Sequence, residues 1–309
     1  MRSLDRLIDQ VRKQTENEEF SQFTGIGDQE FIQYLNDAQY NLQSLIVQQH
    51  PRVFIEEVVI DSVGGTERYD LPSNTFLGNM VHNVEYSATG LEEDFYVLEQ
   101  DTLKYRSPGV TGDPLKYIRI SNQILLSPAP QRGGKIRINY VKRLRELDKR
   151  QAQIVKSADQ TISSANFTLS LETNEFDTNI EFLKEHDFIC IVDKEGRNIV
   201  KNIEITGVSL SELTCVGHTL ASGESDTIPA GSYIVGGKDT TTHSELSIET
   251  ERYLIAYAAW KILKRDSSVD SQEAEGELSR MAEEIVKSYA VITDDIQYIP
   301  QLSSWDDWS

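Results

Sequence analysis

The chain has 309 residues, which is long enough for roughly two domains with a sizeable core. Its 30 Lys and Arg residues against 50 Asp and Glu residues give a net charge of −20, and 39% of its residues are hydrophobic. This composition excludes a disordered chain and argues against binding of nucleic acid through a wide basic surface. No signal-peptide pattern opens the chain, and no run of about 18 apolar residues predicts a membrane span.

Two helices are expected at the start of the chain. A short amphipathic helix follows Ser3 and gives way to a polar loop that ends at Gly27. A second helix begins at Asp28 and runs to about His50, where Pro51 stops it. The apolar positions are Leu4, Leu7, Ile8 and Val11 in the first helix, and Phe31, Leu35, Ala38, Leu42 and Leu45 in the second.

The apolar period changes to two at Val53, so residues 53–143 predict a small, mainly antiparallel β unit. Gly64-Gly65 predicts a hairpin between the segments on either side, Asn122-Gln123 predicts a second hairpin tip, and Gly133-Gly134 predicts a third turn. Residues 97–107 form the only stretch of this unit that is expected to make a helical turn. The basic residues 142–150, KRLRELDKR, predict a helix-favouring hinge.

The polar residues 151–243 contain short alternating segments, which predict a second β domain that ends near Thr242. Helices return at Ser247. The third helix has a wide apolar face that predicts burial on two sides, and the fourth begins at Asp270 or Ser271. The apolar positions are Ile248, Tyr253, Ile255, Tyr257, Ala258, Ala259, Trp260 and Ile262 in the third helix, and Ala274, Leu278, Met281 and Ile285 in the fourth.

These elements predict an α+β fold, in which four helices pack as a bundle and both β regions lie between the second and third helices. The expected division is residues 1–52 for the N-terminal helices, 53–150 for the antiparallel β unit and hinge, and 151–243 for the inserted β domain. Residues 244–292 are expected to hold the C-terminal helices, and residues 293–309 a docking tail.

Signals of catalysis, metal binding and phosphate binding are weak. Residues 231–239 resemble a phosphate-binding loop, but Ser232 replaces its first glycine and Asp239 replaces its Ser or Thr. The histidines lack metal-ligand spacing, and adjacent acidic residues on a strand point to opposite faces. Cys190 and Cys215 are expected as buried thiols, with a disulfide as the lesser alternative. No enzymatic activity, metal or cofactor is therefore expected. The histidines are His50, His82, His186, His218 and His243.

The end of the chain carries large side chains on a segment with too few apolar residues to fold alone. Aromatic side chains on such segments commonly supply interface hot spots, so this tail predicts docking to a partner. The alternative is a strand or coil that folds back on its own body. The candidate docking residues are Tyr298, Ile299, Pro300, Trp305 and Trp308.

Two stretches resemble the head-to-tail adaptor proteins of tailed bacteriophages, which are also called connector or head-completion proteins. In residues 31–74, the expected second helix contains the sequence YLNDAQ and is followed by Pro51. A Y-x-L-P motif then begins at Tyr69. Residues 117–141 form an expected hairpin with the pattern L-x-P-x-P from Leu126. The resemblance is strongest to the adaptors of short-tailed phages.

The resemblance implies a homo-oligomeric ring, expected to be a dodecamer, beneath the portal protein. The ring would contact a tail nozzle or tail tube protein, and the C-terminal tail would dock to the portal. The implied location is the neck or tail of the virion after assembly in the host cytoplasm. The acidic charge suits a channel through which genomic DNA passes without specific binding, and no membrane partner is expected.

The inserted β domain departs from the shorter family members. It is expected on the outside of the ring, where tail fibres are a candidate partner. The alternative function is a carbohydrate- or surface-binding protein without catalysis, in which aromatic side chains of residues 151–243 stack on sugars. Those aromatic residues are Phe167, Phe176, Phe182, Phe188 and Tyr233.

Overall fold

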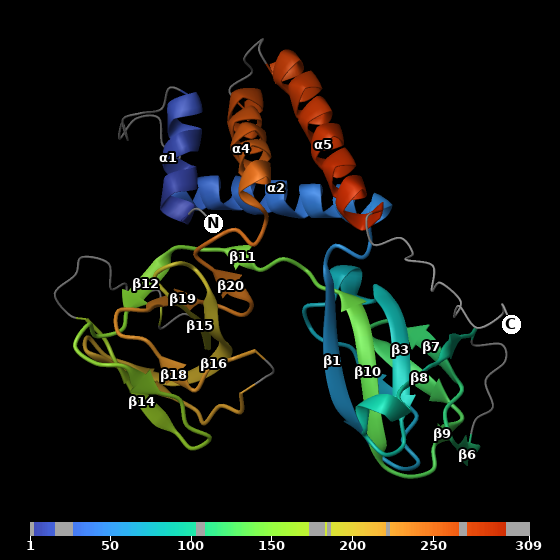
Figure 1. Cartoon of the computed structure of the whole chain (residues 1–309). Coiled ribbons are helices and arrows are strands. Elements are labelled where there is room, and N and C mark those ends of the chain that lie inside the picture. Colours follow the sequence, from blue (N-terminus) through green and yellow to red (C-terminus); the bar gives the residue numbers. More distant parts are fainter. Residues whose placement is uncertain are drawn as a thin grey trace, which may run out of the picture. The chain divides into compact units, whose positions relative to one another are not determined.

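The structure is a computed structural model that describes residues 3–15, 27–102, 109–172, 183, 187–220, 223–265 and 271–294. The chain divides into two compact units. Unit 1 is Met1–Gln43 with Leu144–Glu283, and unit 2 is Ser44–Arg143 with Glu284–Ser309. The order of elements is two helices, many strands and two further helices, so the α+β class is confirmed (Figure 1).

Both N-terminal helices form as predicted, as α1 (Leu4–Gln14) and α2 (Asp28–Gln49). The four apolar positions of α1 are buried, and the backbone N–H of Leu4 donates to the carbonyl of Thr242 (2.9 Å). Along α2 the last buried side chains are Ile46 and Val47, whereas Leu45 is only half-buried. The core-facing stripes therefore follow the helical periodicity of the sequence.

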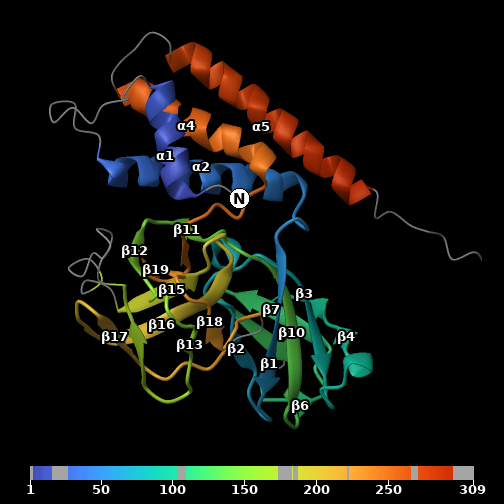
Figure 2. The same cartoon turned by 60° about the vertical axis from the view of Figure 1, so that its left-hand side comes forward.

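The C-terminal helices are α4 (Glu251–Arg265), which follows the 3-10 turn η4 (Ile248–Thr250), and α5 (Ser271–Asp294). The apolar face predicted for the third helix is not buried along its whole length, because Ile248 lies in η4 and is 55% exposed. Tyr253 is buried, whereas Tyr257 and Trp260 are half-buried. Within unit 1, α1 packs beside α4 and α2 crosses both (Figures 1 and 2). A bundle of all four helices stays a prediction.

The strands of unit 2 form two four-stranded sheets that share one core, to which both contribute buried residues such as Tyr86 and Ile124. The first sheet has the order β1 (Ile55–Ser62), β10 (Gly134–Val141), β3 (Val81–Ser87) and β4 (Tyr96–Val97). The second has the order β2 (Arg68–Asp70), β8 (Gln123–Ser127), β7 (Lys116–Ile120) and β5 (Glu99–Gln100). A short pair, β6 (Thr111–Gly112) with β9 (Ala129–Pro130), completes the unit.

One local prediction for unit 2 is wrong, and a second fails over the residues that the structure describes. The glycines at 64 and 65 do not close a hairpin, because β1 pairs with β10 and β2 pairs with β8 in the other sheet. The Tyr69 hydroxyl donates to the carbonyl of Thr66 (2.9 Å) and holds this connection as a corner between the sheets. The expected helical turn is absent at 97–102, where β4 ends and β5 forms, and the rest of that stretch, residues 103–107, lies outside the described residues. The second hairpin is confirmed, with β7 and β8 joined by Ser121-Asn122.

A six-stranded sheet makes up most of the inserted β region of unit 1. Cys190 and Cys215 are fully buried free thiols in this sheet, as predicted, and burial raises the pKa of Cys215 to about 12. The sheet order is β12 (Arg150–Gln153), β19 (Tyr233–Gly236), β15 (Phe188–Val192), β16 (Asn198–Val208), β17 (Glu212–Cys215) and β14 (Phe167–Ser170). Beside it, β13 (Gln160–Thr161) pairs with β18 (Thr227–Ile228).

The hinge is extended where a helix-favouring segment was predicted. Residues Glu146–Leu147 form β11, which pairs in parallel with β20 (Thr240–Thr241). The reason is tertiary, since side chains of α2 bind the hinge backbone that a helix would have used for its own hydrogen bonds.

Candidate interaction sites

The predicted docking residues lie outside the part of the chain that the structure describes. This holds for Tyr298, Ile299, Pro300, Trp305 and Trp308, so their role stays a prediction. Within unit 1, the described residues form two polar sites that the sequence did not reveal. The first is a junction between α2 and the hinge, and the second is a basic pocket beside the start of α1.

The junction consists of three amide side chains on one face of α2. Asn36, Gln39 and Gln43 are three and four residues apart, so they line up along the helix. Together they form hydrogen bonds with backbone N–H and C=O groups of the hinge, as a neighbouring strand would do in a sheet. The bonds run from Asn36 Nδ2 to Leu147 O (3.0 Å), Leu147 N to Asn36 Oδ1 (2.8 Å), Gln39 Nε2 to Arg145 O (2.7 Å) and Leu144 N to Gln43 Oε1 (3.2 Å).

Arg145 extends this junction toward the β region. Its backbone N–H and its Nε both donate to the carboxylate of Glu245, each at 3.1 Å, and its Nη1 donates to Asn198 Oδ1 at 2.8 Å. The Arg145 and Glu245 side chains are only 12% and 15% exposed. Charge-assisted hydrogen bonds between side chains that are so little exposed to solvent are strong. They connect the hinge to Glu245 in the segment before α4 and to the first residue of strand β16.

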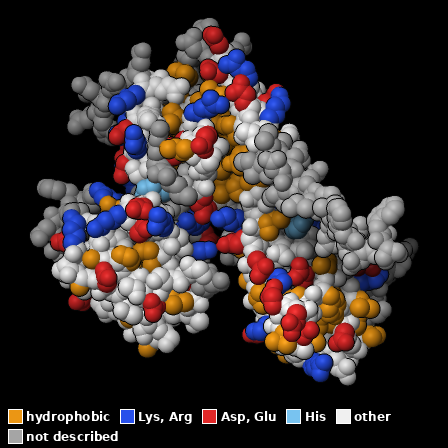
Figure 3. All heavy atoms as spheres, in the orientation of Figure 1, with side chains coloured by type: hydrophobic (Ala, Val, Ile, Leu, Met, Phe, Trp, Pro, Cys, Tyr) orange, Lys and Arg blue, Asp and Glu red, His pale blue; other side chains and the backbone are white. Residues whose placement is uncertain are grey.

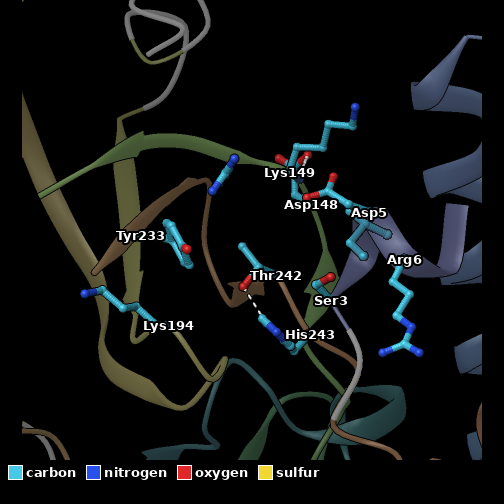
Figure 4. Close-up of a pocket in the computed structure, with 11 residues that line it drawn as sticks. Ser3, Asp5, Arg6, Asp148, Lys149, Lys194, Tyr233, Thr242 and His243 are labelled. Atoms are coloured by element: carbon cyan, nitrogen blue, oxygen red, sulfur yellow. Dashed lines mark hydrogen bonds between the residues drawn. The ribbon is translucent and has the colours of Figure 1, made fainter. Parts of the chain in front are cut away.

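The basic pocket has a volume of about 370 Å³ and lies entirely within unit 1. Figure 4 shows Arg6 of α1 on one side and Lys194 and Tyr233 on the other, with Thr242 and His243 between them. Its lining carries more cationic than acidic side chains, and the first N–H groups of α1 add positive charge. The cations are Arg6, Lys149, Arg150 and Lys194, and the acids are Asp5 and Asp148.

Two of these cations have defined neighbours. Lys149 forms an ion pair with Asp28 at the start of α2, and the Arg150 guanidinium lies 5.1 Å from the centre of the Tyr233 ring. The pocket therefore favours a small anionic group, such as a carboxylate, over a cation. Lys149 and Arg150 are neighbours in the basic hinge, which was a partial signal in the sequence, whereas Arg6 and Lys194 join them only in the folded chain.

His243 forms the floor of this pocket and is 7% exposed. Its Nδ1 shares a hydrogen bond with Thr242 Oγ1 at 2.8 Å, and its ring packs against the backbone of Gly196. Burial is the main cause that lowers the pKa of His243 below its usual value of 6.5.

Acidification is expected to destabilise the protein through His243. Because the folded pKa lies below the unfolded value, the unfolded chain takes up the proton first, and stability falls as the pH drops through about 6.5. The substitution His243→Gln should reduce the fall in melting temperature between pH 7.5 and pH 5.5. Identical falls for the two proteins would contradict this role of His243.

The described residues contain no group of three His, Cys, Asp or Glu side chains that would hold a metal ion. The glycine-rich stretch continues from β19 into β20 rather than into a helix, and Lys238 Nζ lies 3.8 Å from the centre of the Phe188 ring. It therefore lacks the helix N-terminus of a phosphate-binding loop. No helix in the described segments is long and apolar enough to span a membrane.

The aromatic residues proposed to stack on sugars do not form an exposed row where they are described. Phe167 packs against the core of the β region, while Phe188 and Tyr233 are half-buried under Lys238 and Arg150. The remaining candidates, Phe176 and Phe182, lie outside the described residues.

The comparison with protein families agrees with the resemblance seen in the sequence. The family model of the SU10 adaptor protein matches residues 2–163, which is just over half of the chain. The matched span contains α1, α2, the sheets of unit 2 and the hinge, and it ends within the inserted β region after β13. No curated protein matches the sequence.

Proposed function

Because the chain belongs to the SU10 adaptor protein family, it is a structural protein of a bacteriophage, and we propose that it forms a ring joining the portal to the tail. The family match over residues 2–163 carries this proposal. An adaptor of this kind belongs to the virion neck and works through its interfaces rather than through an active site. The ring we propose is a dodecamer that assembles in the host cytoplasm and contacts the portal protein on one side and a tail nozzle or tail tube protein on the other.

The charge of the chain supports a further part of this proposal. A ring of copies that each carry a net charge of −20 repels phosphate groups. Genomic DNA would then pass through the channel without specific binding. The two contacts between neighbouring copies in a ring are made by different surfaces, so each copy needs two complementary patches.

The C-terminal tail is the proposed portal-docking element, and its two tryptophans are the residues we expect to matter most. Replacing both, as Trp305→Ala with Trp308→Ala, removes two aromatic anchors, each worth about 2 kcal/mol at a hot spot. The affinity for the cognate portal should fall by about a thousandfold if the two contributions add, and by at least about thirtyfold if they do not, measured by binding to immobilised portal. Unchanged affinity would contradict docking through these residues.

A matched control separates the aromatic contribution from the acidic charge beside it. Asp306→Asn with Asp307→Asn alters the same segment but leaves both indole rings in place. This variant should bind the portal nearly as well as the unaltered chain, because exposed charges contribute little to affinity at physiological salt.

The inserted β region, residues 151–243, is proposed to lie on the outside of the ring and to receive tail fibres. Most of it lies beyond the family match, which is consistent with an addition to a shared adaptor body. Electron microscopy of assembled necks tests this assignment directly, and fibres attached to another component would refute it.

A further inference from the structure

Strand β1 of unit 2 has an edge that no described element covers. It is the outermost strand of its sheet and pairs only with β10, in continuous register over all eight of its residues (Figure 1). Lys142 N donates to Phe54 O (2.9 Å), so the hydrogen-bonded pairs of this ladder fall on the even-numbered residues of β1. The backbone N–H and C=O groups that point away from β10 belong to Ile55, Glu57, Val59 and Asp61.

Most features that protect an edge strand from further pairing are missing from β1. Its sequence, IEEVVIDS, has no proline or lysine, and its pairing with β10 has no bulge. Val59, in the middle of the strand, is 44% exposed, and Val63 just beyond the strand is 60% exposed. The edge therefore presents unpaired backbone groups together with an apolar side chain, as sheets that accept an added strand do.

Negative charge restricts what can pair with this edge. Glu57 and Asp61 lie on the same face as Val59, and their side chains are 52% and 78% exposed, although each pairs with a cation of β10. Figure 3 shows carboxylates beside hydrophobic side chains on the visible face of these sheets. Two β1 edges would bring like charges together, so β1 does not favour its own copy in a neighbouring chain. It favours an extended segment with Lys or Arg at alternate positions.

The described strands of the chain do not offer such a segment to a neighbouring copy. Only β10 carries cations at alternate positions, Lys135 and Arg137, and it is already paired on both sides, by β1 and β3. The charge pattern therefore favours a different protein as the partner. The proposed function assigns the portal to the C-terminal tail of the chain, which leaves the protein on the tail side for this edge.

We propose that the open edge of β1 binds an extended basic segment of the tail nozzle or tail tube protein, which adds one strand to the sheet. This contact rests on the proposed function. The added strand exchanges hydrogen bonds with the odd-numbered residues of β1, and its alternate cations lie beside Glu57 and Asp61. Backbone hydrogen bonds provide the affinity, and the charges select a basic segment over a second β1 edge.

A proline at position 59 tests the backbone part of this contact in the full chain. The N–H of Val59 points away from β10, so Val59→Pro removes a donor from the open edge and leaves the existing ladder in place. Its affinity for the purified cognate tail protein should fall at least about tenfold, while ring assembly on the cognate portal should not change. Val59→Thr keeps the N–H and suits a strand, so this control should retain most of the affinity.

Charge reversal tests the selectivity of the edge. Glu57→Lys with Asp61→Lys should also weaken binding of the tail protein at least about tenfold. Asp187→Lys with Glu204→Lys, at exposed positions of the inserted region, makes the same change in net charge and should bind like the unaltered chain. Tail-protein binding that neither Val59→Pro nor the reversal at β1 weakens would overturn the proposal. Folded β1 variants that no longer form rings on the portal would also overturn it, because the edge would then join neighbouring copies.

Amide hydrogen exchange detects the contact directly. In the chain alone, the odd-numbered amides of β1 have no acceptor among the described residues and should exchange quickly. The tail protein should slow exchange at Val59 at least about tenfold, whereas the portal alone should not. Unchanged exchange in a complex that contains the tail protein would overturn the edge contact. Protection by the tail protein in a chain that forms no ring on the portal would contradict the proposed function and leave the edge contact standing.

Discussion

The substitution Gly196→Ala is expected to destabilise unit 1 by about 3 kcal/mol or more. Gly196 has a φ of +83°, which costs energy for any residue with a Cβ. A Cβ there would also lie 2.1 Å from Cγ of the buried His243 ring, and that ring cannot move without disturbing Thr242. Urea unfolding followed by circular dichroism measures the loss.

Gly223 provides the matched control for this prediction. Its φ is also +83°, but no atom of the described residues lies within 4 Å of the position that a Cβ would take. Gly223→Ala therefore pays only the backbone penalty, expected at about 1 kcal/mol. If both substitutions cost the same, the packing of Gly196 against His243 would not contribute to stability.

The substitution Arg145→Met is expected to cost about 3 kcal/mol of stability. It removes the guanidinium whose Nε donates to the Glu245 carboxylate, which is 15% exposed, and leaves that carboxylate with the hydrogen bond from the backbone N–H of residue 145. It also removes the bond from the hinge to Asn198 at the start of β16. The double variant Arg145→Met with Glu245→Met should cost less than the single one, because the largely buried carboxylate that loses its guanidinium in the single variant is removed as well.

An exposed ion pair of the same unit serves as the comparison. Arg197 and Glu195 are 2.9 Å apart, but their side chains are 78% and 69% exposed. Arg197→Met is therefore expected to change the free energy of unfolding by less than about 0.5 kcal/mol. Equal losses for Arg145→Met and Arg197→Met would show that the junction does not hold the hinge in the way described.

Helices were predictable from the sequence because their signals are local. The apolar spacing lies within α1 and α2 themselves, and Pro51 follows directly after the end of α2. Strand pairing was less accessible, since β1 finds its partner in β10 across the whole β unit rather than in the next segment of the chain. The conformation of the hinge was also not predictable from local signals. Its helical propensity is overridden because side-chain amides of α2, about 100 residues earlier in the sequence, bind its backbone carbonyl groups.

The candidate sites also differ in whether their signals are local in the sequence. The tail tryptophans could be proposed as docking residues because their type and position are visible in the sequence alone, and their role stays a prediction. The polar junction was missed because Asn36, Arg145 and Glu245 are distant in sequence, and none belongs to a known motif. The resemblance to phage adaptors came from two stretches, and the family match includes both of them.

The most direct test of the proposed function is the mass of the purified protein, alone and with its cognate portal, by light scattering and negative-stain microscopy. The account predicts that a ring forms or grows on the portal, with one end of the portal occupied by density that the adaptor accounts for. A protein that keeps one mass and shape whether or not the portal is present would contradict it.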